Sequence, residues 1–510
     1  MSQTSTVPAP EEGTVKKPLS ATELFHRVAD PGTFVPWHIP LIDVHPNEKY
    51  AAELERAAQK SGVDESVISG EARIHGRRVA FVACEFSFMA GTIGMAAAER
   101  LVATIERATA QGLPLLAGPA SGGTRMQEGT LAFMAMVKIS AAIAKHKEAG
   151  LPYLVYLRNP TTGGVMATWG SLGHLTVAEP GALVGFLGPR VHEALFGFAF
   201  PEGVQTSENL FKHGLLDAVV GPDQLPAIID RVLGILMSPR EQHFADALPE
   251  QPEIVFTGTS DSIERSRRRD RPGVKAFLKY AASDVLPLNG TGEGEHDPGV
   301  ILALARFGGM SCVIMGQDRV SQRTGKPLGP AALREARRGM RLAVELKLPL
   351  VTVIDTPGAA LTREAEEGGL AQEIARCLSD LTTIQTPVVS VILGEGTGGG
   401  AIALLPADYT IASQHGWLAP LPPEGASAII HRDLTHAMEM AEAQGVSSEA
   451  LLANGIVDHV VPELPDAADE PAAFCARLAA SLEQTLAHLG NTQISQLLEA
   501  RYDRYRRLGL

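Results

Sequence analysis

The sequence predicts an α/β protein made of two similar domains in tandem. The chain has 510 residues, about three times the length of a typical domain, and 45% of its residues are hydrophobic. Apolar strand-like runs alternate with helix-like stretches, and this alternation indicates an α/β architecture. The same order of elements occurs twice, at a nearly constant offset in residue number. The sequence therefore favours a duplicated domain.

Three blocks carry the duplication, and they occur in the same order in both halves. The offset in residue number is 235 for the first block, 235 to 236 for the second and 241 for the third. Three blocks in one order make chance a poor explanation. The pairs are LPLLA (113–117) with LPLVT (348–352), LPYLVYLRNPTTGGVMA (151–167) with TPVVSVILGEGTGGGAIA (386–403), and KHGLLDAVV (212–220) with ANGIVDHVV (453–461).

Each copy is expected to begin with β structure and to continue with a helix. In the first copy the segment RRVAFVACEFSF is the β-rich start. The helix predicted over 94–112 places Leu101, Ile105 and Ala108 on one face. Its counterpart in the second copy begins at Gly329, which corresponds to Gly94 at the offset of the first block. A buried strand, a glycine loop, a helix, a second buried strand, a second glycine loop and a helix then follow in each copy.

Composition shifts mark the expected domain boundaries. Residues between the two copies are rich in proline, acids and glycine, and they include the basic run RSRRRDRPG, which is typical of a linker. We therefore expect a disordered tail over 1–19, domains over 20–238 and 297–490, a linker over 239–296, and a charged C-terminal helix over 491–510.

Charge and cysteine content exclude several classes of protein. The net charge of −14 gives no positive field to hold a nucleic acid. The four cysteines lie dozens of residues apart, so neither a zinc ribbon nor a disulfide framework is expected. The polar N-terminus and the absence of any run of eighteen apolar residues predict a cytoplasmic protein without a membrane segment.

The strongest chemical signal is a set of four glycine loops, each between an apolar strand and a helix. Free backbone amides at a helix start bind anions, and glycine lets a ligand oxygen approach closely. A phosphate and a developing oxyanion fit such a loop equally well. For one loop a tight turn without function is the simpler interpretation, but four loops paired across a duplication favour a binding function. The loops are Ser121–Gly123, Thr162–Val165, Thr356–Ala359 and Thr397–Ala401.

Other sources of chemistry are weaker. The sequence has no P-loop and no GxSxG elbow, and GEGTGGG lacks the acidic residue that a dinucleotide site expects. Glu128 is a candidate general base, but Arg125 nearby makes a structural ion pair at least as plausible. The basic run can hold a phosphate or form a solvated surface. Four histidines without metal-ligand spacing are interpreted as structural, namely His174, His213, His415 and His459.

At this point the motifs resemble those of the biotin-dependent carboxyltransferase family, whose members have two crotonase-like domains. The first half resembles the beta subunit of acetyl-CoA carboxylase carboxyltransferase and the second half resembles the alpha subunit. The chain as a whole resembles the fused beta/alpha chain of actinobacteria. The first half matches through ASGGTRMQEG (120–129), NPTTGGVMATWGSLGHLTVAEPGALVGFLGPRV (159–191) and LLDAVV (215–220). The second half matches through VIDTPGA (353–359), AEEGGLAQEIA (365–375), VILGEGTGGGAIAL (391–404) and LPPEGASAI (421–429).

The resemblance implies a fold and a reaction. The fold is two tandem crotonase-like β-β-α superhelix domains. The reaction moves a carboxyl group from N-carboxybiotin to the α-carbon of an acyl-CoA, and acetyl-CoA would give malonyl-CoA for fatty acid biosynthesis. No MKM biotin-attachment motif is present, so biotin is expected on a separate carrier protein, and a separate biotin carboxylase is expected to load it. No metal is predicted, since the zinc ribbon of the separate beta subunit is missing.

The resemblance also assigns the glycine loops to two oxyanion holes. The catalytic residues are expected to be Gly163, Gly164, Gly399 and Gly400. On the acyl-CoA side the first pair is assisted by Gly122 and Gly123, and on the biotin side the second pair is assisted by Gly358 and Ala401. The family further implies a homodimer or dimer-based oligomer whose active sites lie between the first domain of one protomer and the second domain of its partner.

Two alternatives stay open at this stage. A malonyl-thioester decarboxylase subunit resembles this chain in both halves and runs carboxyl transfer in the opposite sense, although the AEEGG and PPEGAS segments favour the carboxylase. A non-catalytic scaffold subunit would keep the fold, but it would not need intact glycine loops.

Overall fold

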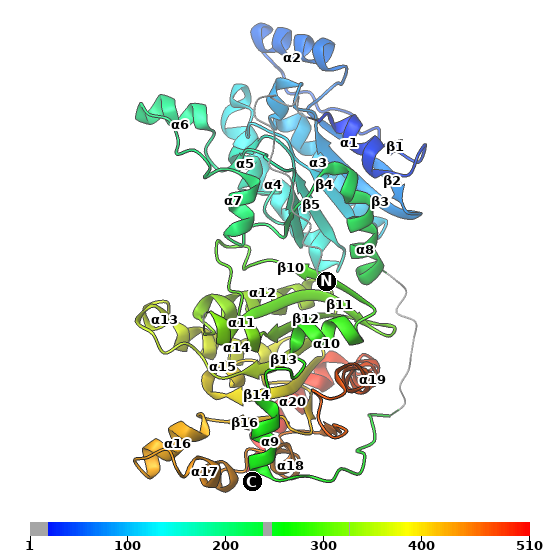
Figure 1. Ribbon diagram of the computed structural model, residues 1–510. Helices are drawn as coiled ribbons and strands as arrows, with labels where there is room; N and C mark the ends of the chain where they lie inside the picture. Colours follow the sequence, from blue (N-terminus) through cyan, green and yellow to red (C-terminus); the bar gives the residue numbers. More distant parts are fainter. Residues whose placement is uncertain (1–18, 238–246, 326, 510) are drawn as a thin grey trace.

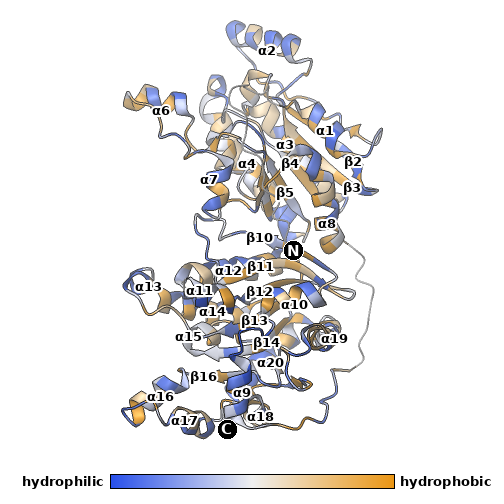
Figure 2. Ribbon diagram, viewed as in Figure 1, coloured by the Kyte–Doolittle hydropathy of each residue, from blue (hydrophilic) through white to orange (hydrophobic). Residues whose placement is uncertain are grey.

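The computed structural model describes residues 19–237, 247–325 and 327–509 and shows two α/β layers stacked one on the other (Figure 1). Residues 1–18 of the expected tail (1–19) lie outside the described residues. Each layer has one main β-sheet with helices packed around it, and hydrophobic residues lie along the sheets (Figure 2). The predicted α/β class is confirmed.

The first sheet has seven strands in the order β1-β2-β3-β4-β5-β7-β9. The hairpin β2–β3 is antiparallel, and the strands from β3 to β9 are parallel. The carboxyl ends of the parallel strands therefore meet at one edge, where the loops to the helices begin. The strands are β1 (Val35–Pro36), β2 (Val67–Ile74), β3 (Arg77–Cys84), β4 (Leu115–Gly118), β5 (Tyr153–Leu157), β7 (Leu175–Ala178) and β9 (Ala218–Val219), with β6 (Thr161–Thr162) and β8 (Val184–Gly185) forming a small second sheet.

The second sheet repeats this order as β10-β11-β12-β13-β14-β15-β17, and β16 pairs with the end of β14. It also begins with antiparallel strands and continues with parallel ones. The strands are β10 (Asp284–Leu288), β11 (Val300–Phe307), β12 (Met310–Gln317), β13 (Leu350–Thr356), β14 (Val388–Thr397), β15 (Tyr409–Ser413), β16 (Trp417–Ala419) and β17 (His459–Val461).

The strand register confirms the internal repeat. Leu115 pairs with Tyr153 in the first sheet, and Leu350 pairs with Val388 in the second, so both partners differ by the same offset in residue number. The last parallel strands, β9 and β17, are related by the larger offset of 241 that the sequence shows. Because the offset is the same on neighbouring strands, the loops at their carboxyl ends occupy matching places in the two layers.

The helices follow the predicted alternation with the strands. The predicted helix over 94–112 is α3, and its counterpart after Gly329 is α12. The predicted C-terminal helix is α20. In the first half the helices are α1 (Ala21–Val28), α2 (Glu48–Ser61), α3 (Met95–Ala110), α4 (Gly129–Glu148), α5 (Gly163–Met166), α6 (Pro189–Phe196), α7 (Ser207–Lys212) and α8 (Leu225–Met237). Further along they are α9 (Thr259–Ser266), α10 (Val274–Ala281), α11 (Arg319–Thr324), α12 (Pro330–Glu345), α13 (Arg363–Glu367), α14 (Leu370–Thr383), α15 (Gly398–Ile402), α16 (Pro423–Ile430), α17 (Ala437–Ala443), α18 (Ser448–Ala453), α19 (Pro471–Leu489) and α20 (Ile494–Arg506).

The segment expected to be a linker, 239–296, contains structural elements of the second half. Residues 239–246 lie outside the described residues, but α9, α10 and β10 lie within the segment. Strand β10 forms the edge of the second sheet by pairing with β11 over its whole length, from Asp284 to Leu288. The linker expectation is therefore corrected for these elements. The sequence did not predict these elements because the segment is rich in proline and charged residues and because α9 and β10 each bury only some of their side chains.

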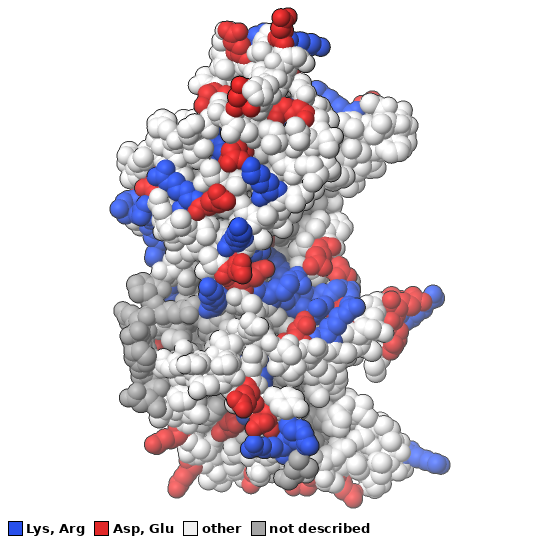
Figure 3. Space-filling model, turned by 180° about the vertical axis from the view of Figure 1, so that it is seen from behind, with Lys and Arg blue, Asp and Glu red and all other residues white. Residues whose placement is uncertain are grey.

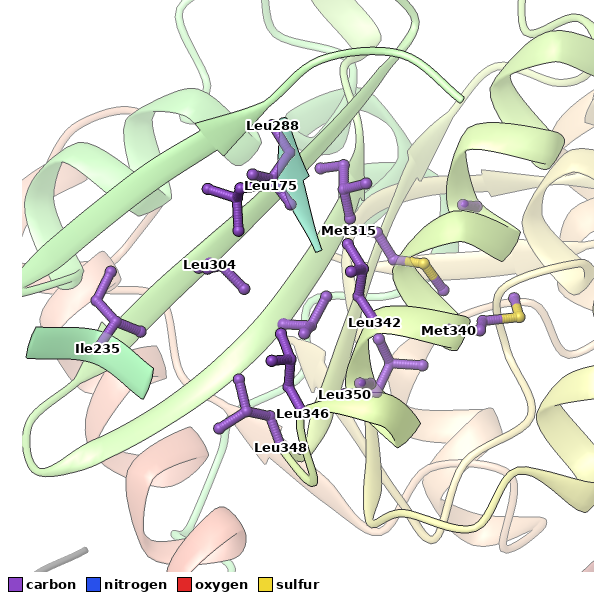
Figure 4. Close-up of a cluster of buried hydrophobic side chains, with 14 of the residues drawn as sticks. Leu175, Ile235, Leu288, Leu304, Met315, Met340, Leu342, Leu346, Leu348 and Leu350 are labelled. Carbon is purple, nitrogen blue, oxygen red and sulfur yellow. The ribbon is translucent and has the colours of Figure 1, made fainter. Parts of the chain in front are cut away.

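The two layers share one buried apolar cluster. Leu175 from the first sheet and Ile235 from α8 lie in the same cluster as Leu304, Met315 and Leu342 from the second half (Figure 4). Buried polar contacts join the layers as well. Arg338 on α12 donates two hydrogen bonds to Asp217, at 2.8 and 3.0 Å. The two halves thus pack as one body.

Charged side chains of both signs are mixed on the face shown in Figure 3, and no continuous basic area covers it. The outward arginines of α12 illustrate this, since Arg334 pairs with Glu295, Arg337 with Asp380 and Arg341 with Glu293. This distribution is consistent with the net negative charge and does not favour nucleic acid binding.

Candidate functional site

The predicted glycine loops of the first half lie at the carboxyl edge of its sheet. One loop follows β4 and contains Ser121–Gly123, and the other follows β5 and leads through Thr162 into α5. The two loops contact each other directly: the Thr162 amide donates to the Ser121 carbonyl at 2.9 Å. Gly163 adopts a φ of +66°, a left-handed conformation that favours glycine at this turn.

Most amides of these two loops already have acceptors inside the protein. The Gly163 amide donates to the Phe186 carbonyl at 2.8 Å, and the Gly122 amide donates to the Ala90 carbonyl at 2.9 Å. The Gly123 amide donates to the Ser121 hydroxyl at 3.0 Å. Within the described part of the chain, the amides of Thr124 and Gly164 have no acceptor. These two amides are therefore the available donors for a ligand oxygen.

The second half repeats this arrangement. The Gly358 amide donates to the Thr356 hydroxyl at 3.1 Å, as the Gly123 amide does to Ser121. The Ala360 amide donates to the Leu328 carbonyl at 2.8 Å, as the Arg125 amide does to Ile93 at 2.9 Å. Over the described residues no acceptor is found for the amides of Ala359, Gly399 and Gly400. Gly399 matches Gly164, since each is the second residue of its helix and follows a glycine with a positive φ, so the offset of 236 expected for the glycine pairs is corrected to 235. Ala359 and Gly399 thus stand where Thr124 and Gly164 stand, with the Gly400 amide next to them.

The two donors of each pair lie close together. A Cβ atom placed on Gly400 would lie 3.3 Å from the Ala359 nitrogen, and one placed on Gly164 would lie 2.9 Å from the Thr124 Oγ1. A Cβ on Gly123 would lie 3.4 Å from the Gly164 nitrogen. Glycine at these positions therefore keeps open the space in front of the paired amides.

The predicted glycine residues divide into two groups. Gly164, Gly399 and Gly400 carry available amides, and Ala401 lies with the last two in the first turn of α15. Gly163, Gly122, Gly123 and Gly358 shape the loops instead, as their turn conformations or hydrogen bonds show. Sequence analysis did not single out Thr124 or pick Ala359 for the site. The signal for both was their place directly after a glycine that is paired across the duplication.

Glu128 is held by other groups of the protein. It accepts hydrogen bonds from the Tyr50 hydroxyl and from the Met95 amide at the start of α3. Arg125 lies 3.5 Å away, and it is fully buried in a pair with Glu65. Burial and the hydrogen bond to Glu128 raise the pKa of Tyr50. Glu128 thus caps a helix, and the structural interpretation of Glu128 with Arg125 is favoured over the catalytic one.

The four histidines show no common site. His174, His415 and His459 are buried, and burial lowers the pKa of each imidazole. His213 is exposed and its Nδ1 lies 2.9 Å from the Asn209 carbonyl. In the described residues, no three His, Cys, Asp or Glu side chains gather in a group able to hold a metal ion.

The basic run of the expected linker is paired with acids. Arg267 contacts Glu424 at 2.6 Å, Arg268 contacts Asp270 at 2.9 Å, and buried Arg271 binds Glu463 at 2.6 Å. The phosphate-binding interpretation of these three arginines is therefore not supported. None of the helices within the described ranges has the length and apolar character needed to cross a membrane.

The two donor pairs lie in different layers but on the same side of the molecule. Helices α5 and α15, which follow the donor loops, are both on the left in Figure 1, where α6, α13 and α16 project. Large apolar side chains are exposed on α4, α6 and α16 and before α13. They include Leu131, Phe133, Met134 and Val137 on α4, Val191, Leu195 and Phe196 on α6, Leu361 before α13, and Ile429 and Ile430 on α16.

Comparison with known proteins gives matches over nearly the whole chain. Residues 32–492 match the family model of the carboxyl transferase domain. A probable biotin-dependent acyl-coenzyme A carboxylase beta3 subunit of Mycobacterium tuberculosis is 56% identical over 493 residues, covering 96% of this chain and 99% of the relative. The acetyl-coenzyme A carboxylase carboxyl transferase subunits beta/alpha of Salinispora tropica are 35% identical over 521 residues, covering 96% and 91%.

Among solved structures, transcarboxylase 12S with methylmalonyl-coenzyme A and methylmalonic acid bound superimposes with a TM-score of 0.70 at 22% identity, covering 91% of this chain and 89% of that chain. This likeness confirms the predicted fold of two tandem crotonase-like domains. The family model spans both halves, both donor pairs and the shared core. The chain therefore belongs to the carboxyl transferase family.

Proposed function

We propose that this chain is the carboxyltransferase component of a biotin-dependent acyl-CoA carboxylase and that its acceptor is acetyl-CoA, giving malonyl-CoA. The observation that carries the proposal is the pair of matching donor sites, Thr124 with Gly164 in the first half and Ala359 with Gly399 and Gly400 in the second. The names of the relatives support the class of reaction, since one is an acyl-CoA carboxylase subunit and another an acetyl-CoA carboxylase subunit.

The chemistry requires two places where negative charge on oxygen is stabilised. When bound, carboxybiotin on a separate carrier supplies the carboxyl group and a base for the α-proton of the acyl-CoA. The amides of Thr124 and Gly164 donate to the thioester oxygen as it becomes an enolate oxygen. The amides of Ala359 and Gly400 donate to the ureido oxygen of the biotin ring. Neutral amides without internal acceptors fit both oxygens, because each gains charge in the transition state and carries little before it.

The first half is proposed for the acyl-CoA side and the second half for the biotin side. Gly122, Gly123 and Gly163 keep their proposed places on the acyl-CoA side by shaping the loop that presents Gly164. Gly358 and Ala401 keep theirs beside Gly399 and Gly400. The division rests on the resemblance of the first half to a beta subunit and of the second half to an alpha subunit.

The placement of the loops supports a dimer. Helices α5 and α15, which follow the donor loops, lie in different layers but towards the same side of the chain (Figure 1). A twofold-related copy placed against this side would bring the first half of one chain to the second half of the other. Exposed apolar residues on α4, α6 and α16 would be buried by such a partner. We therefore propose a homodimer or dimer-based oligomer with shared sites.

A reconstituted assay tests the proposal. The purified chain is mixed with a biotinylated carrier protein, biotin carboxylase, ATP and labelled bicarbonate, and a series of acyl-CoAs is supplied. We expect labelled malonyl-CoA to form from acetyl-CoA, with lower kcat/KM for longer acyl chains. Labelling of only longer acyl-CoAs would disprove the choice of acetyl-CoA. No labelling of any acyl-CoA would disprove the carboxylase, and release of carbon dioxide from malonyl-CoA without biotin transfer would favour the decarboxylase.

A further inference from the structure

The first half contains a buried arginine that has only carbonyl partners. Arg158 follows β5 directly, and its side chain is 0% exposed. Its guanidinium donates to the Gly118 carbonyl at 2.7 and 3.2 Å, to the Leu19 carbonyl at 2.7 Å and to the Cys84 carbonyl. Over the described residues no carboxylate lies within ion-pair distance of Arg158, and burial lowers the pKa of its guanidinium.

Other buried arginines of the chain are neutralised by an acid. Arg125 pairs with Glu65 at 2.5 Å, Arg271 with Glu463 at 2.6 Å, and Arg501 with Asp408 at 2.6 Å. Burying a charge without such a partner is costly, so its retention calls for a specific role. The positions of the carbonyls that the Arg158 guanidinium binds indicate what this role is.

Those carbonyls belong to the ends of neighbouring strands. Cys84 ends β3 and Gly118 ends β4, while Arg158 itself follows β5, so the guanidinium spans three parallel strands at their carboxyl edge. Gly118 lies six residues before Thr124, and Arg158 lies six residues before Gly164. The side chain therefore connects the bases of the two loops that carry the available amides.

A second set of bonds ties the same loop bases. The Arg158 amide donates to the Pro119 carbonyl at 3.0 Å. The Thr161 hydroxyl lies 3.0 Å from the Pro119 carbonyl and 2.8 Å from the Arg158 carbonyl, within hydrogen-bond distance of both. Both loops thus begin from one connected group of backbone atoms, and their separation is fixed at that point.

The second half connects its loop bases without an arginine. Asp355 Oδ1 accepts a hydrogen bond from the Glu395 amide at 3.2 Å, and the Gln317 side chain binds both the Asp355 amide and the Gly400 carbonyl. At the offset of 235 that the strand registers give, the counterpart of Arg158 is Leu393, a buried apolar residue. Asp355 stands where the first half has Ala120, and it faces buried Arg319 from α11 at 3.5 Å. The arginine between the loop bases is therefore a feature of the first half alone.

We propose that Arg158 is a positioning residue for carboxyl transfer: by joining the ends of β3, β4 and β5, it fixes the spacing at which the Thr124 and Gly164 amides converge on the acceptor's oxygen. This inference rests on the proposed function. It predicts that altering Arg158 weakens transition-state stabilisation more than substrate binding, because the guanidinium touches neither ligand and acts through the loop spacing.

The test uses Arg158→Lys in the reconstituted carboxylase, with Arg501→Lys as the matched control. Lysine keeps the charge but has one compact ammonium, which cannot span carbonyls on three strands. Arg501 is equally buried and also binds three carbonyls, but these lie before β14, away from the glycine loops. We expect kcat to fall by about tenfold or more in Arg158→Lys, with the KM for acetyl-CoA within about twofold of wild type. In Arg501→Lys we expect a lower Tm and a kcat within about twofold of wild type.

A milder variant, Thr161→Val, keeps the shape of the side chain and removes the hydroxyl ties to Pro119 and Arg158. It carries the test if Arg158→Lys does not fold, and we expect a smaller fall in kcat, about threefold to tenfold, at unchanged KM. A kcat within twofold of wild type in a folded Arg158→Lys chain overturns the inference. An equal fall in kcat in Arg501→Lys also overturns the inference. If only Thr161→Val folds, an unchanged kcat in that variant overturns it. If the wild-type chain itself transfers no carboxyl group, the proposed function fails instead.

Discussion

Gly400→Ala is a sharp test of the proposed biotin-side donors. Gly400 lies in a helical turn and does not need a left-handed φ, so alanine adds no backbone strain. The new Cβ would lie 3.1 Å from Leu328 Cδ2 and 3.3 Å from the Ala359 nitrogen. Both distances are a few tenths of an ångström too short, so the two loops must move apart or the Cβ must cover the Ala359 N–H. In either case one donor is lost or misdirected.

The loss of one such donor costs about 2.7 to 4 kcal/mol of transition-state stabilisation, which corresponds to a fall of about 10² to 10³ in kcat. We expect the loss of folding stability to be smaller than the loss of transition-state stabilisation. Leu328 Cδ2, the atom nearest to the new Cβ, lies at the flexible end of its side chain and can move. We expect kcat for malonyl-CoA formation to fall about a hundredfold in the reconstituted assay. The far-ultraviolet circular dichroism should be native.

Gly221→Ala is the matched control. Gly221 has a φ of −69°, and its added Cβ would meet nothing closer than Gln224 Oε1 at 3.8 Å. We expect wild-type kcat from this variant. The reasoning about paired amides is refuted if folded Gly400→Ala retains a kcat within threefold of the control, because the donor geometry would then not limit the reaction.

Three further outcomes are expected. The purified chain with ATP, bicarbonate and acetyl-CoA should form no malonyl-CoA until a biotinylated carrier and biotin carboxylase are added; product without them contradicts the assignment of biotin to a separate carrier. Chains carrying Gly164→Val or Gly400→Val should each be inactive. After subunit exchange their mixture should recover about a quarter of wild-type activity, because half the dimers are mixed and one of the two sites in each mixed dimer is native. Exchange without recovery of activity would place each site within one chain. Burial raises the pKa of Glu335 to about 7, so the native state holds a proton that the unfolded state releases near pH 4.5. The free energy of unfolding should therefore decrease between about pH 4.5 and 7, and a urea titration series should show this slope weakened in Glu335→Gln.

The sequence allowed the fold and the general location of the site to be predicted because both depend on local patterns. The apolar runs at 113–117 and 348–352 became β4 and β13, each bounded as expected by a glycine loop. The repeat correctly related the loops of the two halves, since parallel strands in matching registers bring matching loops to matching places. Gly164 and Gly400 could thus be placed in loops at the sheet edges without coordinates, and their role in a site stays a prediction.

The division of labour within the loops depended on contacts that the sequence does not show. The Gly163 amide is taken up by the carbonyl of Phe186, which lies further along the same motif, but the sequence does not show that the two residues meet. Thr124 and Ala359 differ in side chain, yet their amides occupy equivalent places because the neighbouring bonds to Ile93 and Leu328 are equivalent. The amides that are available to a ligand can be identified only when the structure shows which acceptors the other loop amides bind.

The duplication also explains how one backbone plan can serve two different oxygens. Main-chain geometry is common to both halves, down to the hydroxyls of Ser121 and Thr356 that hold the glycine amides. What differs is the buried chemistry beneath the loops: an arginine held by carbonyls in the first half, and the Arg319–Asp355 pair in the second. Since amides alone do not distinguish a thioester oxygen from a ureido oxygen, the specialisation of each half must come from these supporting groups and from the walls around the amides. The two halves therefore share a means of stabilising charge and differ in the buried groups that hold their loops.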